Sequence, residues 1–174
     1  MALSVPNPAA LLDLAGTDLG TTEWLTVDQQ RINEFADATG DHQWIHVDVE
    51  RATAESPFGG PIAHGLLGLS VLAGLSSNFP HVATLALISL REWSFEHPIF
   101  FGDSVRSVTV VKEVARHGRR AGRVTWLREL VNQDGRVVQR GIFITLVATQ
   151  TRSQVRSPRP ASVEAITPAP AELG

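Results

Sequence analysis

The stretch HGLLGLSVLAGLSS, residues 64–77, decides the fold. Its apolar side chains fall on almost every side of a helix of ~20 Å. The pattern therefore predicts a buried helix, because a surface helix would have a polar face. The run is also far shorter than the ~20 apolar residues that are needed to cross a bilayer. A helix of this kind has to be wrapped by other elements of the chain.

Four strand-like segments follow this helix, at residues 83–95, 104–114, 123–131 and 136–149. Asn132-Gln133-Asp134-Gly135 joins the last two segments and is a hairpin signal. We therefore predict a four-stranded antiparallel meander. The last segment is apolar on both faces, which predicts a central place in the sheet. The predicted class is α+β, with a long curved antiparallel sheet wrapped around one buried central helix.

Shorter elements precede the apolar helix. Glu23–Val27 reads as a short strand, and the next residues predict a helix that begins at the N-cap Asp28 and ends at Gly40. Asp48 is the predicted N-cap of a further short helix over Glu50–Ala54.

The length of 174 residues predicts one domain. Its folded part is predicted at 21–150, between an N-terminal arm (1–20) and a Pro-rich, flexible C-terminal tail (151–174). The first 20 residues lack the basic start and continuous apolar run of a signal peptide, so we expect a cytoplasmic protein.

Composition excludes several classes of function. The formal net charge of −3 offers no general attraction to nucleic acid or to an anionic membrane, and neither is expected as a partner. The chain has no Cys and no Tyr, and Lys112 is its single lysine. Thiolate nucleophiles, zinc-thiolate sites and a tyrosine acid are therefore excluded, and a Schiff base is not expected. Any acid or base chemistry falls to His, Asp and Glu.

The segment Gly40-Asp41-His42-Gln43-Trp44-Ile45-His46-Val47-Asp48 is the densest polar stretch. In a regular helix or strand, Asp41 and His46 would point to different sides, so they meet only if the chain bends. Gly40 makes a bend here expected. A carboxylate and an imidazole brought together could position and deprotonate one water molecule.

A second feature is Pro61-Ile62-Ala63-His64-Gly65, which opens the apolar helix. The first N–H groups of a helix have no partner within it and lie at the positive end of its dipole. They can therefore hold a developing oxyanion, and Gly65 lets a carbonyl approach closely. Together, the two features suggest proton transfer next to a carbonyl on an apolar substrate.

These residues carry a family resemblance. The pattern Gly-Asp-x-x-x-Ile-His-x-Asp followed by Ile-Ala-His-Gly resembles the MaoC-like dehydratases, the R-specific enoyl-CoA hydratases of the hotdog fold. The resemblance covers about residues 21–150. The positions that match the family motif are Asp41, His46, Asp48, Ala52, Ile62, His64 and Gly65.

The resemblance implies an activity in fatty acid metabolism, the hydration of a trans-2-enoyl-CoA to the (R)-3-hydroxyacyl-CoA or the reverse dehydration. Asp41 and His46 would hold the water that adds to C3 and deliver a proton to C2, and the Gly65 N–H would polarise the thioester carbonyl. The resemblance also implies a homodimer with the channel for an acyl-CoA or acyl-carrier thioester at the subunit interface. It implies no metal and no redox cofactor, since coenzyme A enters as part of the substrate.

The sequence departs from the usual family pattern at two positions. Gln43 and Trp44 stand where Asn and Pro are common, and both are candidates for substrate binding together with His64. Arg119 and Arg120 lie among several arginines at one predicted turn and are candidates for pairing with the phosphates of coenzyme A. The alternative for these arginines is a solvated hairpin tip.

Structural roles compete with these assignments. Asp41 could cap a turn and His46 could be a buried structural histidine. His64 more readily orders the start of the helix than donates protons, and Asp48 is favoured as an N-cap. His42 and His46 are four residues apart without an HExxH pattern, so no metal site is expected.

Two further functions stay open at this point. Gln43 and Trp44 motivate a non-catalytic acyl-thioester binding protein or the partner subunit of a heteromeric dehydratase. A thioesterase on the same fold would be recognised by release of free coenzyme A.

Overall fold

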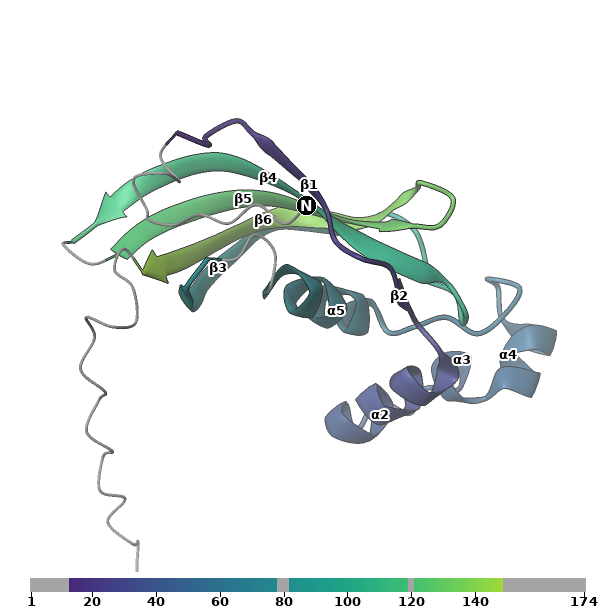
Figure 1. Ribbon diagram of the computed structural model, residues 1–174. Helices are drawn as coiled ribbons and strands as arrows, with labels where there is room; N and C mark the ends of the chain where they lie inside the picture. Colours follow the sequence, from purple (N-terminus) through teal and green to yellow (C-terminus); the bar gives the residue numbers. More distant parts are fainter. Residues whose placement is uncertain (1–12, 78–81, 119–120, 149–174) are drawn as a thin grey trace, which may run out of the picture.

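The computed structural model describes residues 13–77, 82–118 and 121–148. Its main feature is one curved antiparallel sheet with a helix on the concave side (Figure 1). The strands are β1 (Asp18–Thr21), β2 (Leu25–Thr26), β3 (Thr84–Phe95), β4 (Ser104–His117), β5 (Ala121–Asn132) and β6 (Val137–Ala148). The helices are α2 (Gln29–Thr39), α3 (Trp44–Val47), α4 (Val49–Glu55) and α5 (Gly65–Ser77). In Figure 1, α5 lies under the sheet and the three shorter helices gather to one side of it.

The strand order corrects the predicted meander. The sheet runs β1-β4-β5-β6-β3, with β2 also paired to β4. β4, β5 and β6 are consecutive hairpins, but β3 pairs with β6 and not with its neighbour in sequence, β4. The reason lies in residues 96–103, which pair with the segment before α5 through Ala63 N–H to Ile99 O (2.7 Å) and Phe101 N–H to Pro61 O (3.2 Å). This connection carries the chain from β3, at one edge of the sheet, to β4, which lies beside β1 at the other edge. It therefore cannot form a tight hairpin.

The other predicted elements agree with the structure. β6 lies between β5 and β3, so its predicted place inside the sheet is confirmed. Gly135, at a φ of 76°, closes the predicted hairpin with its N–H on Asn132 O. Asp28 caps α2 by accepting from Arg31 N–H, and Asp48 caps α4 by accepting from Arg51 N–H. β1 begins at Asp18, inside the segment predicted as an arm, while the C-terminal tail lies outside the described residues.

The core lies between α5 and the concave face of the sheet. Leu67, Val71 and Leu72 of α5 are buried in one cluster with Trp126 and Phe143. The prediction of a fully buried helix is wrong on one side, because Leu66 is 60% exposed. Leu66, Ser70 and Gly74 form an exposed stripe at intervals of four residues. None of the helices in the described parts of the chain is long and apolar enough to cross a membrane.

Candidate active site

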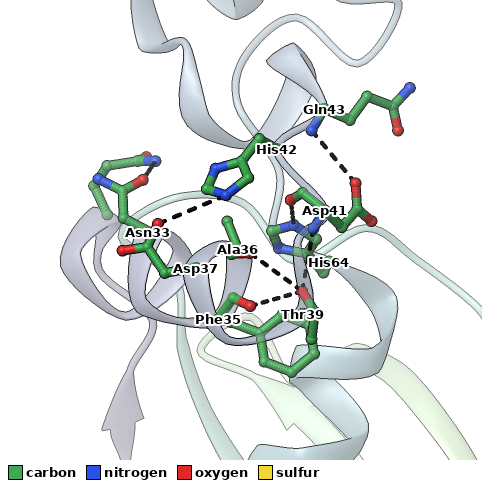
Figure 2. Close-up of polar contacts among 10 residues, drawn as sticks. Asn33, Phe35, Ala36, Asp37, Thr39, Asp41, His42, Gln43 and His64 are labelled. Carbon is green, nitrogen blue, oxygen red and sulfur yellow. Dashed lines mark hydrogen bonds and ion pairs between the residues drawn. The ribbon is translucent and has the colours of Figure 1, made fainter. Parts of the chain in front are cut away.

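A sharp bend after α2 brings Asp41 toward the start of α5. Gly40 ends α2 at a φ of 76°, a left-handed conformation that glycine adopts without steric cost, and its N–H bonds to Ala36 O. Asp41 follows the bend, and its carboxylate accepts from the Gln43 N–H at 3.3 Å. Figure 2 shows this contact beside His64. Asp41 does cap a turn, but the carboxylate is exposed and one oxygen is left for other contacts.

His46 lies on the short helix α3 and is 7% exposed. Its Nδ1 lies 2.7 Å from Ile62 O. Since a carbonyl only accepts hydrogen bonds, Nδ1 carries the proton and Nε2 of the neutral ring is an acceptor. Burial lowers the pKa of His46 below its usual 6.5, and the nearby His64 lowers it further. The His46 ring is therefore held neutral at physiological pH.

His64 joins the bend to the start of α5. Its Nε2 donates to the backbone carbonyl of Asp41 at 2.8 Å, and its ring stacks on His46 with centroids 3.9 Å apart. The side chain is 3% exposed and the buried Nδ1 has no hydrogen-bond partner in the described chain. This arrangement fits the predicted role of ordering the start of the helix.

Ligand atoms of Asp41, His46 and His64 all lie within 4.8 Å of one another. The sequence placed these residues in two motifs, and the fold brings them together. Two histidine nitrogens and a carboxylate could hold a divalent ion such as Zn²⁺. The same donors could equally hold and deprotonate a water molecule. The predicted absence of a metal stays a prediction.

Gly65 is the first residue of α5, next to this cluster. The N–H groups of Leu67 and Gly68 bond to His64 O, whereas the N–H of Gly65 precedes them and has no acceptor within the helix. A Cβ at position 65 would lie 2.9 Å from the ring of the exposed Phe95, so this ring would have to shift to admit any larger residue. Gln139 Nε2 donates to Gly65 O at 2.9 Å and fixes this end of the helix to β6.

Other predicted site residues lie elsewhere. The Gln43 side chain extends away from His64 (Figure 2), so what Gln43 contributes is the backbone N–H that orients Asp41. Trp44 packs under Arg51, whose guanidinium carbon lies 4.4 Å from the centroid of the Trp44 ring. His42 faces Asp37 on α2 at 3.7 Å and takes no part in the cluster. Arg119 and Arg120 lie outside the described residues.

Several contributors could not be recognised from the sequence. The Ile62 carbonyl fixes the tautomer of His46, and Gln29 Nε2 donates to His46 O at 2.7 Å. Gln139 holds Gly65 from 74 residues away. Each of these contacts joins separate segments, and glutamine or a backbone carbonyl carries no local signature of such a role.

The fold and the cluster define a class of protein, a hotdog domain with a carboxylate and two histidines beside the start of its central helix. The MaoC-like domain family matches residues 12–132, more than half of the chain. The chain therefore belongs to this family of dehydratases.

The chain is also similar to individual proteins. The chain is 48% identical over 107 residues to nodulation protein N of Rhizobium leguminosarum. This stretch covers 59% of this chain and 66% of that protein, so the chain spans slightly less than two thirds of the length of that relative. It is 43% identical over 104 residues to 3-hydroxyacyl-thioester dehydratase Z of Mycobacterium tuberculosis H37Rv, covering 58% of this chain and 68% of that protein. Among solved structures, a monoamine oxidase regulatory protein from Archaeoglobus matches with a TM-score of 0.72 at 26% identity, covering 87% of this chain and 99% of that one.

Proposed function

We propose that the protein hydrates trans-2-enoyl thioesters to (R)-3-hydroxyacyl thioesters, or catalyses the reverse dehydration, within fatty acid metabolism. One observation carries the proposal: the Asp41 carboxylate, the imidazole of His46 and the N-terminus of α5 meet at one place. The name of the similar 3-hydroxyacyl-thioester dehydratase supports the same chemistry.

The roles follow from the hydrogen bonds. Asp41 accepts a hydrogen bond from the water, and His46 Nε2 accepts a proton from it as the C3–O bond forms. The electrons of the C2=C3 bond move toward the thioester carbonyl. The proton then passes from His46 to C2, so that one water has been added in total. Dehydration is the reverse sequence.

The start of α5 stabilises the charge that develops on the thioester oxygen. The Gly65 N–H lies at the positive end of the helix dipole and would donate to this oxygen. Acid–base groups and backbone donors suffice for the reaction, so we propose that it needs no metal or redox cofactor. The substrate is an acyl-CoA or an acyl-carrier thioester.

The direct test is incubation of the purified protein with crotonyl-CoA, followed by loss of the absorbance of the conjugated thioester. An R-selective dehydrogenase then reads the chirality of the product. We expect (R)-3-hydroxybutyryl-CoA from the wild type and a strongly reduced rate in the Asp41→Asn variant. Release of free coenzyme A would instead indicate a thioesterase, and an unchanged thioester, also with longer acyl chains, would contradict the proposal.

The pH dependence of the reaction should report the lowered pKa of His46. Because the neutral ring is the base, we expect kcat/KM for hydration to rise with pH along a limb whose midpoint lies below 6.5, measured between pH 4.5 and 8. Stability should fall as pH drops below 6.5, because the unfolded chain takes up this proton before the folded one does. An acidic limb centred above 6.5 would contradict the assignment of His46 as base.

We also propose that the protein is a homodimer through β3 and the exposed stripe of α5. In the described residues β3 pairs only with β6, which leaves its other edge open. Its large exposed apolar side chains are Leu85, Leu87, Ile88, Leu90 and Phe95. A second copy that covers this strand would remove both an unpaired edge and a contiguous apolar patch.

Replacement of Leu87 by Glu should convert the dimer to a monomer, since it would place a charge in the proposed apolar interface. The measurement is light scattering coupled to gel filtration at several protein concentrations. Val49→Glu is the matched control, because Val49 is also exposed but lies on α4. A monomeric wild-type protein, or a Leu87→Glu variant that stays dimeric, would count against this interface.

A further inference from the structure

Arg128 is a charged side chain in the core of the domain. Arg128 shares one face of β5 with Trp126 and Leu130, two residues to either side, which pack in the core cluster with α5, and it is 5% exposed. Its guanidinium lies 5.3 Å from the ring centroid of Trp126 and 5.1 Å from that of Phe143. Burial lowers the pKa of Arg128 to about 10, which shows how poorly this place solvates a charge.

The charge has no counter-charge among the described residues. In residues 13–77, 82–118 and 121–148, no carboxylate lies within 4.0 Å of the Arg128 nitrogens. The buried Nε–H also lacks a hydrogen-bond acceptor there. The two aromatic rings attract the cation but do not neutralise it. Buried charges in proteins are normally paired, so this one calls for an anion.

A second donor without an acceptor in the described chain lies on the neighbouring part of the sheet, in β3. Gly141 pairs directly with Arg128 across the strands, and a Cβ at Gly141 would lie 2.5 Å from the Trp93 ring. The indole therefore covers Gly141 beside Arg128. Both Trp93 and Arg128 pack against Phe143, and the buried Trp93 Nε1–H has no acceptor in the described chain. A guanidinium and an indole N–H together suit an anionic oxygen group.

This pair of donors lies close to the proposed thioester site. Gln139, which holds Gly65 O at 2.9 Å, pairs with Leu130 and is therefore a diagonal neighbour of Arg128 on the same face. Diagonal neighbours are about 7–8 Å apart, and their Cβ atoms are somewhat closer. An acyl group of a few carbons, bound with its carbonyl at Gly65, spans such a distance.

We propose that Arg128, together with the Trp93 N–H, binds a carboxylate at the far end of the acyl group, so that the protein prefers thioesters of dicarboxylic acids. The planar guanidinium matches the two oxygens of a carboxylate. The inference rests on the function proposed above for the position of the thioester, and it adds the class of acyl group.

Binding of saturated analogues tests the inference without any turnover, because they have no double bond to hydrate. Calorimetry compares glutaryl-CoA with pentanoyl-CoA, adipyl-CoA with hexanoyl-CoA, and suberyl-CoA with octanoyl-CoA. For at least one pair we expect the dicarboxylic analogue to bind about tenfold more tightly or better, as a charge-assisted hydrogen bond provides. This ratio should fall to about one in Arg128→Met and stay unchanged in Arg136→Met, whose arginine is exposed.

Thermal unfolding without ligand separates a ligand site from a structural ion pair. If Arg128 paired with a carboxylate of a second copy or of another part of the chain, Arg128→Met would leave that carboxylate buried and lower the Tm. The proposal expects an unchanged or higher Tm. Should Arg128→Met fail to fold, Arg128→Lys keeps the charge but loses the planar fork, and the ratio should still fall.

A ratio near one at every chain length, a preference that persists in the Arg128 variants, or a lowered Tm without any preference would overturn the inference. Failure of the proposed function would look different. The wild type would then leave crotonyl-CoA and unsaturated dicarboxylic thioesters unchanged, and the binding ratio of the saturated analogues would still decide whether Arg128 holds a carboxylate.

Discussion

Asp41→Asn and His46→Gln should each lower kcat for the hydration of crotonyl-CoA by roughly 10²–10⁴-fold while the protein stays folded. Asparagine keeps the shape of Asp41 but does not carry the charge that holds the water. Glutamine at position 46 can still donate to Ile62 O, which His46 contacts at 2.7 Å, but offers no base of suitable pKa. The measurement is a steady-state assay, with circular dichroism and thermal unfolding of each variant beside it.

The matched controls for this experiment are Asp37→Asn and His42→Gln. They make the same chemical changes at an exposed pair of side chains, 3.7 Å apart, that takes no part in the cluster. We expect both controls to retain wild-type turnover. Full activity in Asp41→Asn or in His46→Gln would show that the acid–base assignment is wrong.

Gly65→Ala should have the second large effect, a loss of roughly 10²–10³-fold in kcat, as loss of one oxyanion contact typically produces. The N–H at position 65 is retained, but the added methyl group would stand where glycine lets the thioester carbonyl approach, and it would lie 2.9 Å from the Phe95 ring. The assay is again hydration of crotonyl-CoA, with kcat and KM determined separately.

The control is Gly122→Ala on β5, outside both the cluster and the proposed interface. Among the described residues, the nearest heavy atom to a Cβ there lies 3.8 Å away, which is an ordinary contact, so this variant should keep wild-type kcat and KM. A double variant that adds Phe95→Ala to Gly65→Ala removes the ring that the new methyl group would meet, and so separates this contact from the effect of the methyl group itself. If the single Gly65→Ala variant were as active as Gly122→Ala, the need for glycine at this oxyanion contact would be refuted.

Much of the site could be predicted because its residues act locally. Gly40 ends a helix and so produces the bend that Asp41 and His46 require, and the N-caps Asp28 and Asp48 depend on contacts three residues away. The carbonyl of Ile62 and the amide of Gln139 were not predictable, since each reaches its partner only after distant segments pack.

The sequence by itself determined the apolar helix, the hairpins that join β4, β5 and β6, and the two motifs whose residues form the cluster. Periodicity, turn residues and helix signals are local properties, so they can be read along the chain. Only the tertiary structure decided that β3 joins β6, that one side of α5 stays exposed, and that Arg128 is buried without a carboxylate in the described chain. These features depend on which distant segments meet, and strand pairing and burial are set by the packing of the whole domain.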